Sequence, residues 1–250
     1  MTTTVDSSAW IRCFHPRPTA AHRVVVFPHA GGSASFYRPM SAALGEAEVL
    51  NVQYPGRQDR RSEPCISDLG VLADQVFTAL RPALDDDVVF FGHSMGALVA
   101  FEVALRMREQ SLSPRLLFAS GRRAPSRYRD EAVHRRDDDG IIAEMKRLSG
   151  TDARVLGDEE LVRMILPAIR GDYTAVETYR CHPQAVVDCP IEVLTGDADP
   201  VTSADEAQAW REHTSRNCTV HTYRGGHFFL VDHQREVVKL IQDGLAGTRS

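Results

Sequence analysis

The sequence has few cysteines and no long apolar run, and these two features exclude several classes of protein. Its five cysteines are scattered along 250 residues without a CxxC pair, so neither a disulfide framework nor a thiolate metal site is indicated. No apolar stretch approaches the ~20 residues that a membrane span needs, and residues 1–8 lack the basic and apolar regions of a secretory signal. We therefore expect a cytoplasmic chain with reduced thiols and no membrane partner.

Basic residues are not in excess either. The chain has 29 Lys and Arg against 34 Asp and Glu, whereas dedicated nucleic-acid-binding proteins are usually basic. The phosphate-binding patterns GxxxxGK[ST] and GxGxxG are absent, and no group of His, Cys, Asp and Glu has the spacing of metal ligands. We therefore predict no nucleic-acid partner, no metal and no organic cofactor, and we expect a monomer.

The residues that are present have an ordinary globular composition, with 43% hydrophobic and 25% charged residues. A chain of this length buries a sizeable core and fits one domain, which we place at residues 1–250. Short β-branched runs alternate with helical patterns along the chain. This order predicts an α/β fold in which helices flank both faces of a mostly parallel sheet.

The patterns also give the expected position of each element. The predicted strands are 24–27, 48–54, 88–91, 115–119, 191–195 and 219–223. The predicted helices are 68–84, 95–108, 203–213 and 231–245. A Ser-x-x-Glu capping box at 203–206 marks the start of the third helix.

One segment, 122–190, interrupts the alternation because it contains no convincing strand. Its two stretches 141–149 and 158–179 have helical patterns. A structureless loop of this length is improbable within a compact domain. We therefore predict a helical lid insertion that sits on the sheet.

The strongest chemical motif is Gly92-His93-Ser94-Met95-Gly96. It follows a short apolar strand and opens a helix, which is the context of a nucleophile elbow. In such a strained turn the flanking glycines let two backbones pass closely, and the serine hydroxyl stands above the sheet. The motif predicts that Ser94 is a catalytic nucleophile.

A serine hydroxyl needs a base to act as a nucleophile at neutral pH. Among the ten histidines, His227 follows the sixth predicted strand, and the ends of parallel strands are where such sites form. His29 and His93 also lie near the predicted site, but His93 is next to Ser94 on a tight turn and should point away from it. We therefore predict that His227 is the base.

The base needs a carboxylate that orients it and stabilises its charged form. Asp199 and Asp197 both follow the fifth predicted strand, and we favour Asp199, which precedes a proline. The position after the fourth strand, which holds the acid in some hydrolases, is Ser120-Gly121-Arg122 and offers no carboxylate. The resulting chain order of Ser94, Asp199 and His227 is that of α/β-hydrolases, so we predict the α/β-hydrolase fold.

Acyl transfer also needs N–H donors for the developing oxyanion. One predicted donor is the backbone N–H of Met95, the residue after the nucleophile. The other should come from the glycine-rich loop 27–33 after the first predicted strand, and we choose the N–H of Ala30.

Taken together, four motifs resemble one family, the stand-alone type II thioesterases of polyketide and nonribosomal peptide synthesis. The motifs are Phe27-Pro28-His29-Ala30-Gly31-Gly32-Ser33, Tyr54-Pro55-Gly56-Arg57, Gly92-His93-Ser94-Met95-Gly96-Ala97 and Gly225-Gly226-His227-Phe228-Phe229-Leu230. The resemblance covers about residues 10 to 245. It implies an enzyme that hydrolyses aberrant or stalled acyl groups from the phosphopantetheine arm of an acyl carrier protein or carrier domain.

The residues leave some alternatives open. A carboxylesterase or lipase acting on free esters, or a thioesterase that releases a finished product, would use the same three residues. A non-enzymatic binding module on this fold would need a broken triad, which is not indicated. Several arginines crowd the start of the predicted lid, where they either dock an acidic carrier or form an ordinary solvated surface. These arginines are Arg122, Arg123, Arg127, Arg129, Arg135 and Arg136.

Overall fold

The computed structural model describes residues 7–148 and 158–247, and its core is a seven-stranded sheet with the order β1-β3-β2-β4-β5-β6-β7. Neighbouring strands pair in parallel except for β1, which is antiparallel to β3. The strands are β1 (Ile11–Arg12), β2 (His22–Phe27), β3 (Ala47–Val52), β4 (Val88–His93), β5 (Leu116–Ser120), β6 (Ile191–Gly196) and β7 (Cys218–Tyr223). All six predicted strands are confirmed. The two residues of β1 are too few to carry a periodic pattern.

The predicted helices are also present, with differences at their ends, and the predicted helix 203–213 is an α-helix only to Gln208 and a 3-10 helix from there to His213. The described α-helices are α1 (Ser7–Trp10), α2 (Arg38–Ala43), α3 (Leu69–Leu80), α4 (Met95–Glu109), α5 (Asp138–Leu148), α7 (Glu159–Thr178), α8 (Ala204–Gln208), α9 (Phe229–Asp232) and α10 (Gln234–Ala246). The capping box at Ser203 and Glu206 is confirmed. The expected single closing helix is divided at His233 into α9 and α10.

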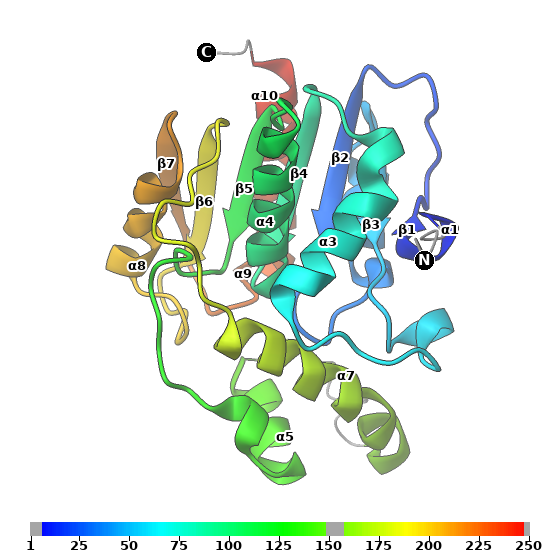
Figure 1. The fold of residues 1–250 in the computed structure, drawn as a ribbon, viewed down its shortest axis with the longest axis vertical. Helices are drawn as coiled ribbons and strands as arrows, with labels where there is room; N and C mark the ends of the chain where they lie inside the picture. Colours follow the sequence, from blue (N-terminus) through cyan, green and yellow to red (C-terminus); the bar gives the residue numbers. More distant parts are fainter. Residues whose placement is uncertain (1–6, 149–157, 248–250) are drawn as a thin grey trace.

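Helices cover both faces of the sheet, as the alternation of apolar runs predicts (Figure 1). Strand β2 shows how the faces are filled, because Val25 and Phe27 pack with α3 and α4, whereas Val24 and Val26 pack with α2 and α10. All four side chains are fully buried. Both faces of β2 are therefore apolar, which is typical of a central parallel strand.

The helices between β5 and β6 lie beyond the carboxyl ends of the parallel strands (Figure 1). The described part of this segment contains no strand, as expected, and the last residue of the predicted helix 141–149 lies outside the described residues. Asp158 caps the start of helix α7, and its side chain accepts hydrogen bonds from the N–H groups of Glu160 and Leu161. Its Leu166 and Ile169 pack with Ile141 of α5 in a small separate apolar cluster.

Candidate active site

Ser94 lies on the tight turn between β4 and α4, with φ of 54° and ψ of −118°. A non-glycine residue with positive φ is strained, and such strain is typical of functional turns. A Cβ added at Gly92 would lie 2.3 Å from the Gly96 carbonyl oxygen, and one added at Gly96 would lie 1.9 Å from the Phe27 carbonyl oxygen. The two flanking glycines are therefore required by close backbone approach, as expected for a nucleophile elbow.

His227 and Asp199 meet in a buried hydrogen bond. His227 Nδ1 lies 2.9 Å from Asp199 Oδ2, and the two side chains are 2% and 0% exposed. The other Asp199 oxygen accepts the N–H of Val201 at 2.9 Å. Asp197, in contrast, is exposed, and its carboxylate accepts the N–H of Gly225 at 2.8 Å. Of the two candidate acids, Asp199 is the one beside the imidazole.

The turn that carries Ser94 lies beside His227. The ring of His93, the neighbour of Ser94 in sequence, is 5.1 Å from the ring of His227 between centroids. Among the described residues there is no hydrogen bond between the Ser94 hydroxyl and His227. Catalytic hydrogen bonds are often loose in ligand-free enzymes and shorten when substrate binds.

The two other histidines near the site are buried and hydrogen bonded. Burial, together with the smaller effects of the nearby His227 and Arg57, lowers the pKa of His29 to about 3. Burial also holds the pKa of His93 well below its usual value. His29 Nδ1 lies 3.0 Å from the Tyr37 hydroxyl, and His93 Nδ1 lies 2.9 Å from the Ser120 hydroxyl. Burial therefore favours the neutral form of both rings, and each ring is hydrogen bonded to a neighbouring hydroxyl.

The two predicted oxyanion donors lie on backbone segments that touch. Met95 is the first residue of α4, where N–H groups have no partner inside the helix. A Cβ added at the next residue, Gly96, would lie 2.7 Å from the carbonyl oxygen of Pro28, at the start of the loop that carries Ala30. Within that loop the N–H of Gly32 donates to the His29 carbonyl at 2.9 Å.

Two further residues near the site were given no role by the sequence. Asp172 of α7 and Arg57, which follows β3, form a buried ion pair, with Arg57 Nη2 at 2.8 and 2.9 Å from the two carboxylate oxygens. Asp172 also accepts the N–H of Gly31 at 2.7 Å. The spacing of residues in the motif Tyr54 to Arg57 does not assign a role to Arg57. In the sequence, Asp172 looks like any polar residue within a helical pattern.

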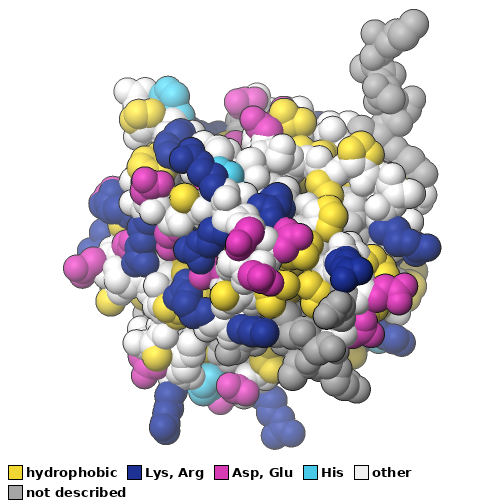
Figure 2. Space-filling view, turned by 90° about the horizontal axis from the view of Figure 1, so that it is seen from below, with side chains coloured by type: hydrophobic (Ala, Val, Ile, Leu, Met, Phe, Trp, Pro, Cys, Tyr) yellow, Lys and Arg dark blue, Asp and Glu magenta, His cyan; other side chains and the backbone are white. Residues whose placement is uncertain are grey.

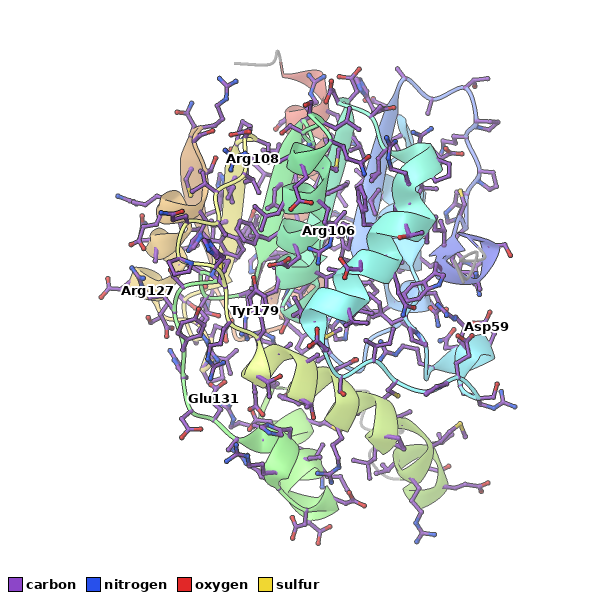
Figure 3. The ribbon with its side chains drawn as sticks, viewed as in Figure 1. Asp59, Arg106, Arg108, Arg127, Glu131 and Tyr179 are labelled. Carbon is purple, nitrogen blue, oxygen red and sulfur yellow. The ribbon has the colours of Figure 1, made fainter. Side chains whose placement is uncertain are left out.

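Most arginines at the start of the predicted lid are paired with carboxylates. Arg123 is bonded to Glu131, and Arg129 to Glu206. Figure 3 shows Glu131 on the connection from β5 to α5. Basic and acidic side chains are mixed on the face seen in Figure 2. Arg123 and Arg129 also donate to the carbonyl oxygens of Val201 and Pro200, beside Asp199. These two arginines therefore hold the loop that carries Asp199.

Within the described residues, 7–148 and 158–247, no group of His, Cys, Asp and Glu is placed to hold a metal ion. None of the helices formed by these residues is long and apolar enough to cross a membrane.

The sheet order, the turn at Ser94 and the Asp199–His227 pair are those of the α/β-hydrolase fold. The family model of the thioesterase domain matches residues 22–245, and the chain belongs to this thioesterase family. The fold class predicted from the sequence and the resemblance to type II thioesterases are both confirmed.

The names of relatives agree with the family. A probable cadicidin biosynthesis thioesterase of Streptomyces griseus is 56% identical over 234 residues, which cover 92% of this chain and 65% of that protein. The thioesterase PikA5 of Streptomyces venezuelae is 50% identical over 249 residues, which cover 98% of this chain and 88% of that protein. The chain thus spans just under two thirds of the first relative and most of the second.

Solved structures give the same result. The type II thioesterase BorB from the borrelidin biosynthetic cluster has a TM-score of 0.89 and 49% identity, covering 97% of this chain and 99% of that one. YbtT, a type II thioesterase from the yersiniabactin pathway, has a TM-score of 0.86 and 28% identity, covering 97% of this chain and 100% of that one.

Proposed function

We propose that this chain is a serine thioesterase that removes aberrant or stalled acyl groups from the phosphopantetheine arm of carrier proteins or carrier domains. We place these carriers in polyketide and nonribosomal peptide synthesis, because the relatives are biosynthetic thioesterases. The observation that carries it is the buried Asp199–His227 hydrogen bond beside the strained turn of Ser94, in a chain of the thioesterase family.

In the first step Ser94 becomes acylated. His227 takes the hydroxyl proton while the Ser94 oxygen attacks the thioester carbonyl carbon. Asp199 accepts from His227 Nδ1, which fixes the tautomer and stabilises the imidazolium. The N–H groups of Met95 and Ala30 stabilise the negative charge on the carbonyl oxygen. The C–S bond then breaks, and the leaving thiolate takes the proton from His227.

In the second step water releases the acyl group. His227 takes a proton from the water as the water oxygen attacks the acyl-enzyme carbonyl. The C–O bond to Ser94 breaks, the serine oxygen recovers its proton from His227, and a carboxylic acid leaves. Asp199 and the two N–H donors act as in the first step.

The segment 122–190 serves in this proposal as a lid over the acyl group and the arm. Helices α5 and α7 support this role because they lie beyond the carboxyl ends of the strands (Figure 1). Ser94 and His227 follow the carboxyl ends of β4 and β7 along the chain. The apolar contacts of Leu166 and Ile169 with α5 give the lid its own small core.

The experiment that tests the proposal measures acyl release from carrier protein loaded with acetyl or propionyl phosphopantetheine. We expect release by the wild type and, for Ser94→Ala, loss of at least about 10³-fold in rate, because the covalent route is removed. Ser215→Ala, at an exposed serine bonded to Asp188, is the matched control and should keep full activity.

Two comparisons separate this function from its alternatives. Faster turnover of p-nitrophenyl acetate and propionate than of the acyl carriers would contradict the proposal and support an esterase. A strong preference for carriers that hold a long, fully elongated acyl chain would instead support product release.

A further inference from the structure

Helix α7 contacts the loop that carries Ala30 at its central residue, Gly31. The Gly31 N–H donates to Asp172 Oδ2 at 2.7 Å. Gly31 has a φ of +71°, and a Cβ added there would lie 2.7 Å from Cγ1 of Ile169, one turn before Asp172. Helix α7 thus packs closely against the backbone of Gly31, which has no side chain, and its Asp172 accepts the Gly31 N–H.

The two ends of the same loop are held by other elements. The hydroxyl of Tyr54 donates to the Pro28 carbonyl at 3.3 Å, and the Ala34 N–H donates to Gln53 Oε1 at 2.9 Å. Both partners follow β3. Among the described residues, the only side-chain hydrogen bond to the Gly31 backbone comes from Asp172. The middle of the loop is thus held by its own turn, in which the Gly32 N–H donates to the His29 carbonyl, and by Asp172 of α7.

Arg57 makes this arrangement compatible with oxyanion chemistry. A lone buried carboxylate near the reacting carbonyl would repel the negative charge that develops in the transition state. The guanidinium of Arg57 lies 2.8 Å from the Asp172 carboxylate, and both side chains are almost fully buried, at 6% and 2% exposure. The pair has no net charge, and its buried position gives it a fixed geometry.

We propose that Asp172 is a positioning residue for the oxyanion hole: by accepting the Gly31 N–H, it fixes the backbone at Ala30 so that the Ala30 N–H is aimed at the reacting carbonyl oxygen. Arg57 holds the Asp172 carboxylate in place and neutralises it. This inference deepens the proposed function and rests on it. It assigns to helix α7 a part in transition-state stabilisation in addition to covering the substrate.

The test uses two double variants that both remove the buried charges. Arg57→Met with Asp172→Asn keeps an amide oxygen that accepts the Gly31 N–H, whereas Arg57→Met with Asp172→Leu has the same shape and no acceptor. Neither leaves an unpaired buried charge, so both should fold. Unfolding temperatures are measured first, and all kinetics are measured below the lower of the two.

We expect the Leu variant to have a kcat about 10- to 100-fold below that of the Asn variant, because a misplaced donor loses part of the 10²–10³-fold effect of an oxyanion N–H. KM for the acyl carrier should be equal in the two variants. The affinity for a boronic acid that forms a tetrahedral adduct on Ser94 should fall by the same factor as kcat. A defect of packing alone would not lower kcat and the affinity for the boronic acid by the same factor.

The matched control is Glu102→Gln. Glu102 of α4 accepts from the Tyr179 hydroxyl at 2.5 Å and so also joins the end of α7 to the rest of the protein, without contact to the loop of Ala30. Figure 3 shows Tyr179 at this end of α7. We expect wild-type kcat from this variant.

The outcomes separate the two proposals. Equal kcat for the two double variants, or a difference confined to KM, would overturn the positioning role of Asp172 while leaving the proposed function intact. No serine-dependent release from acyl carriers by the wild type would overturn the proposed function itself, before any variant is compared.

Discussion

Two aspartates that are two positions apart have different partners. Asp199 is buried against His227, whereas Asp197 is exposed and bonded to the backbone of Gly225. The carboxylate of Asp197 thus supports the turn before His227 without touching its ring. The structure thus agrees with the preference for Asp199 drawn from the sequence, because only Asp199 of the two is buried against the imidazole.

We expect Asp199→Asn to lower kcat on the order of 10⁴-fold, because an amide favours the wrong tautomer of His227. Asp197→Asn keeps an oxygen that can accept the Gly225 N–H, and its kcat should stay within about tenfold of the wild type. Rates of acyl-carrier hydrolysis for the two variants check the assignment. A larger loss in Asp197→Asn would reverse the roles of the two residues.

At the scale of elements, the site depends on how closely helix α4 approaches strand β2. The helix begins directly after Ser94, and its Gly96 faces the carbonyl oxygens of Phe27 and Pro28. This approach brings the start of α4 beside the loop that carries Ala30. The same glycine therefore serves packing and the placement of the two predicted oxyanion donors.

We expect Gly96→Ala to lower the free energy of unfolding by about 1–3 kcal/mol or more, because the new Cβ meets rigid backbone and forces a shift of the helix. Gly45→Ala is the control, since a Cβ there meets nothing within 4 Å. Urea unfolding of the two variants measures the difference. Equal stability would show that α4 can move away from β2 without loss.

At the scale of the whole molecule, the buried histidines link stability to pH. The pKa of His29 is lowered to about 3 by burial, whereas a histidine in an unfolded chain titrates near pH 6.5. Between these values the unfolded chain binds a proton that the folded chain does not. The stability associated with neutral His29 is complete above about pH 6.5 and is lost as the pH falls. His93 acts in the same direction.

We expect the free energy of unfolding to decrease from about pH 7 to about pH 5, and His29→Gln to reduce that slope by up to about 1.4 kcal/mol per pH unit. Urea unfolding at a series of pH values gives the slopes. His182→Gln, at an exposed side chain, is the control and should match the wild type. An unchanged slope in His29→Gln would contradict the buried neutral state of His29.

The sequence by itself determined the six long strands, the turn at Ser94 and the fold class, because these depend on short-range patterns. A buried parallel strand such as 24–27 must be apolar on both faces, and a strand-to-helix turn needs glycine where backbones touch. The choice of Asp199 over Asp197 also followed from local order along the chain, and the hydrogen bond to His227 agrees with it.

Only the tertiary structure decided the partnership of Arg57, Gly31 and Asp172. Arg57 and Asp172 are 115 positions apart and come from different elements, so no periodicity connects them. The division of the closing helix at His233 and the short strand β1 were likewise beyond local patterns. Long-range ion pairs form because folding brings the groups together and removes water from both, and a linear pattern does not encode which groups will meet.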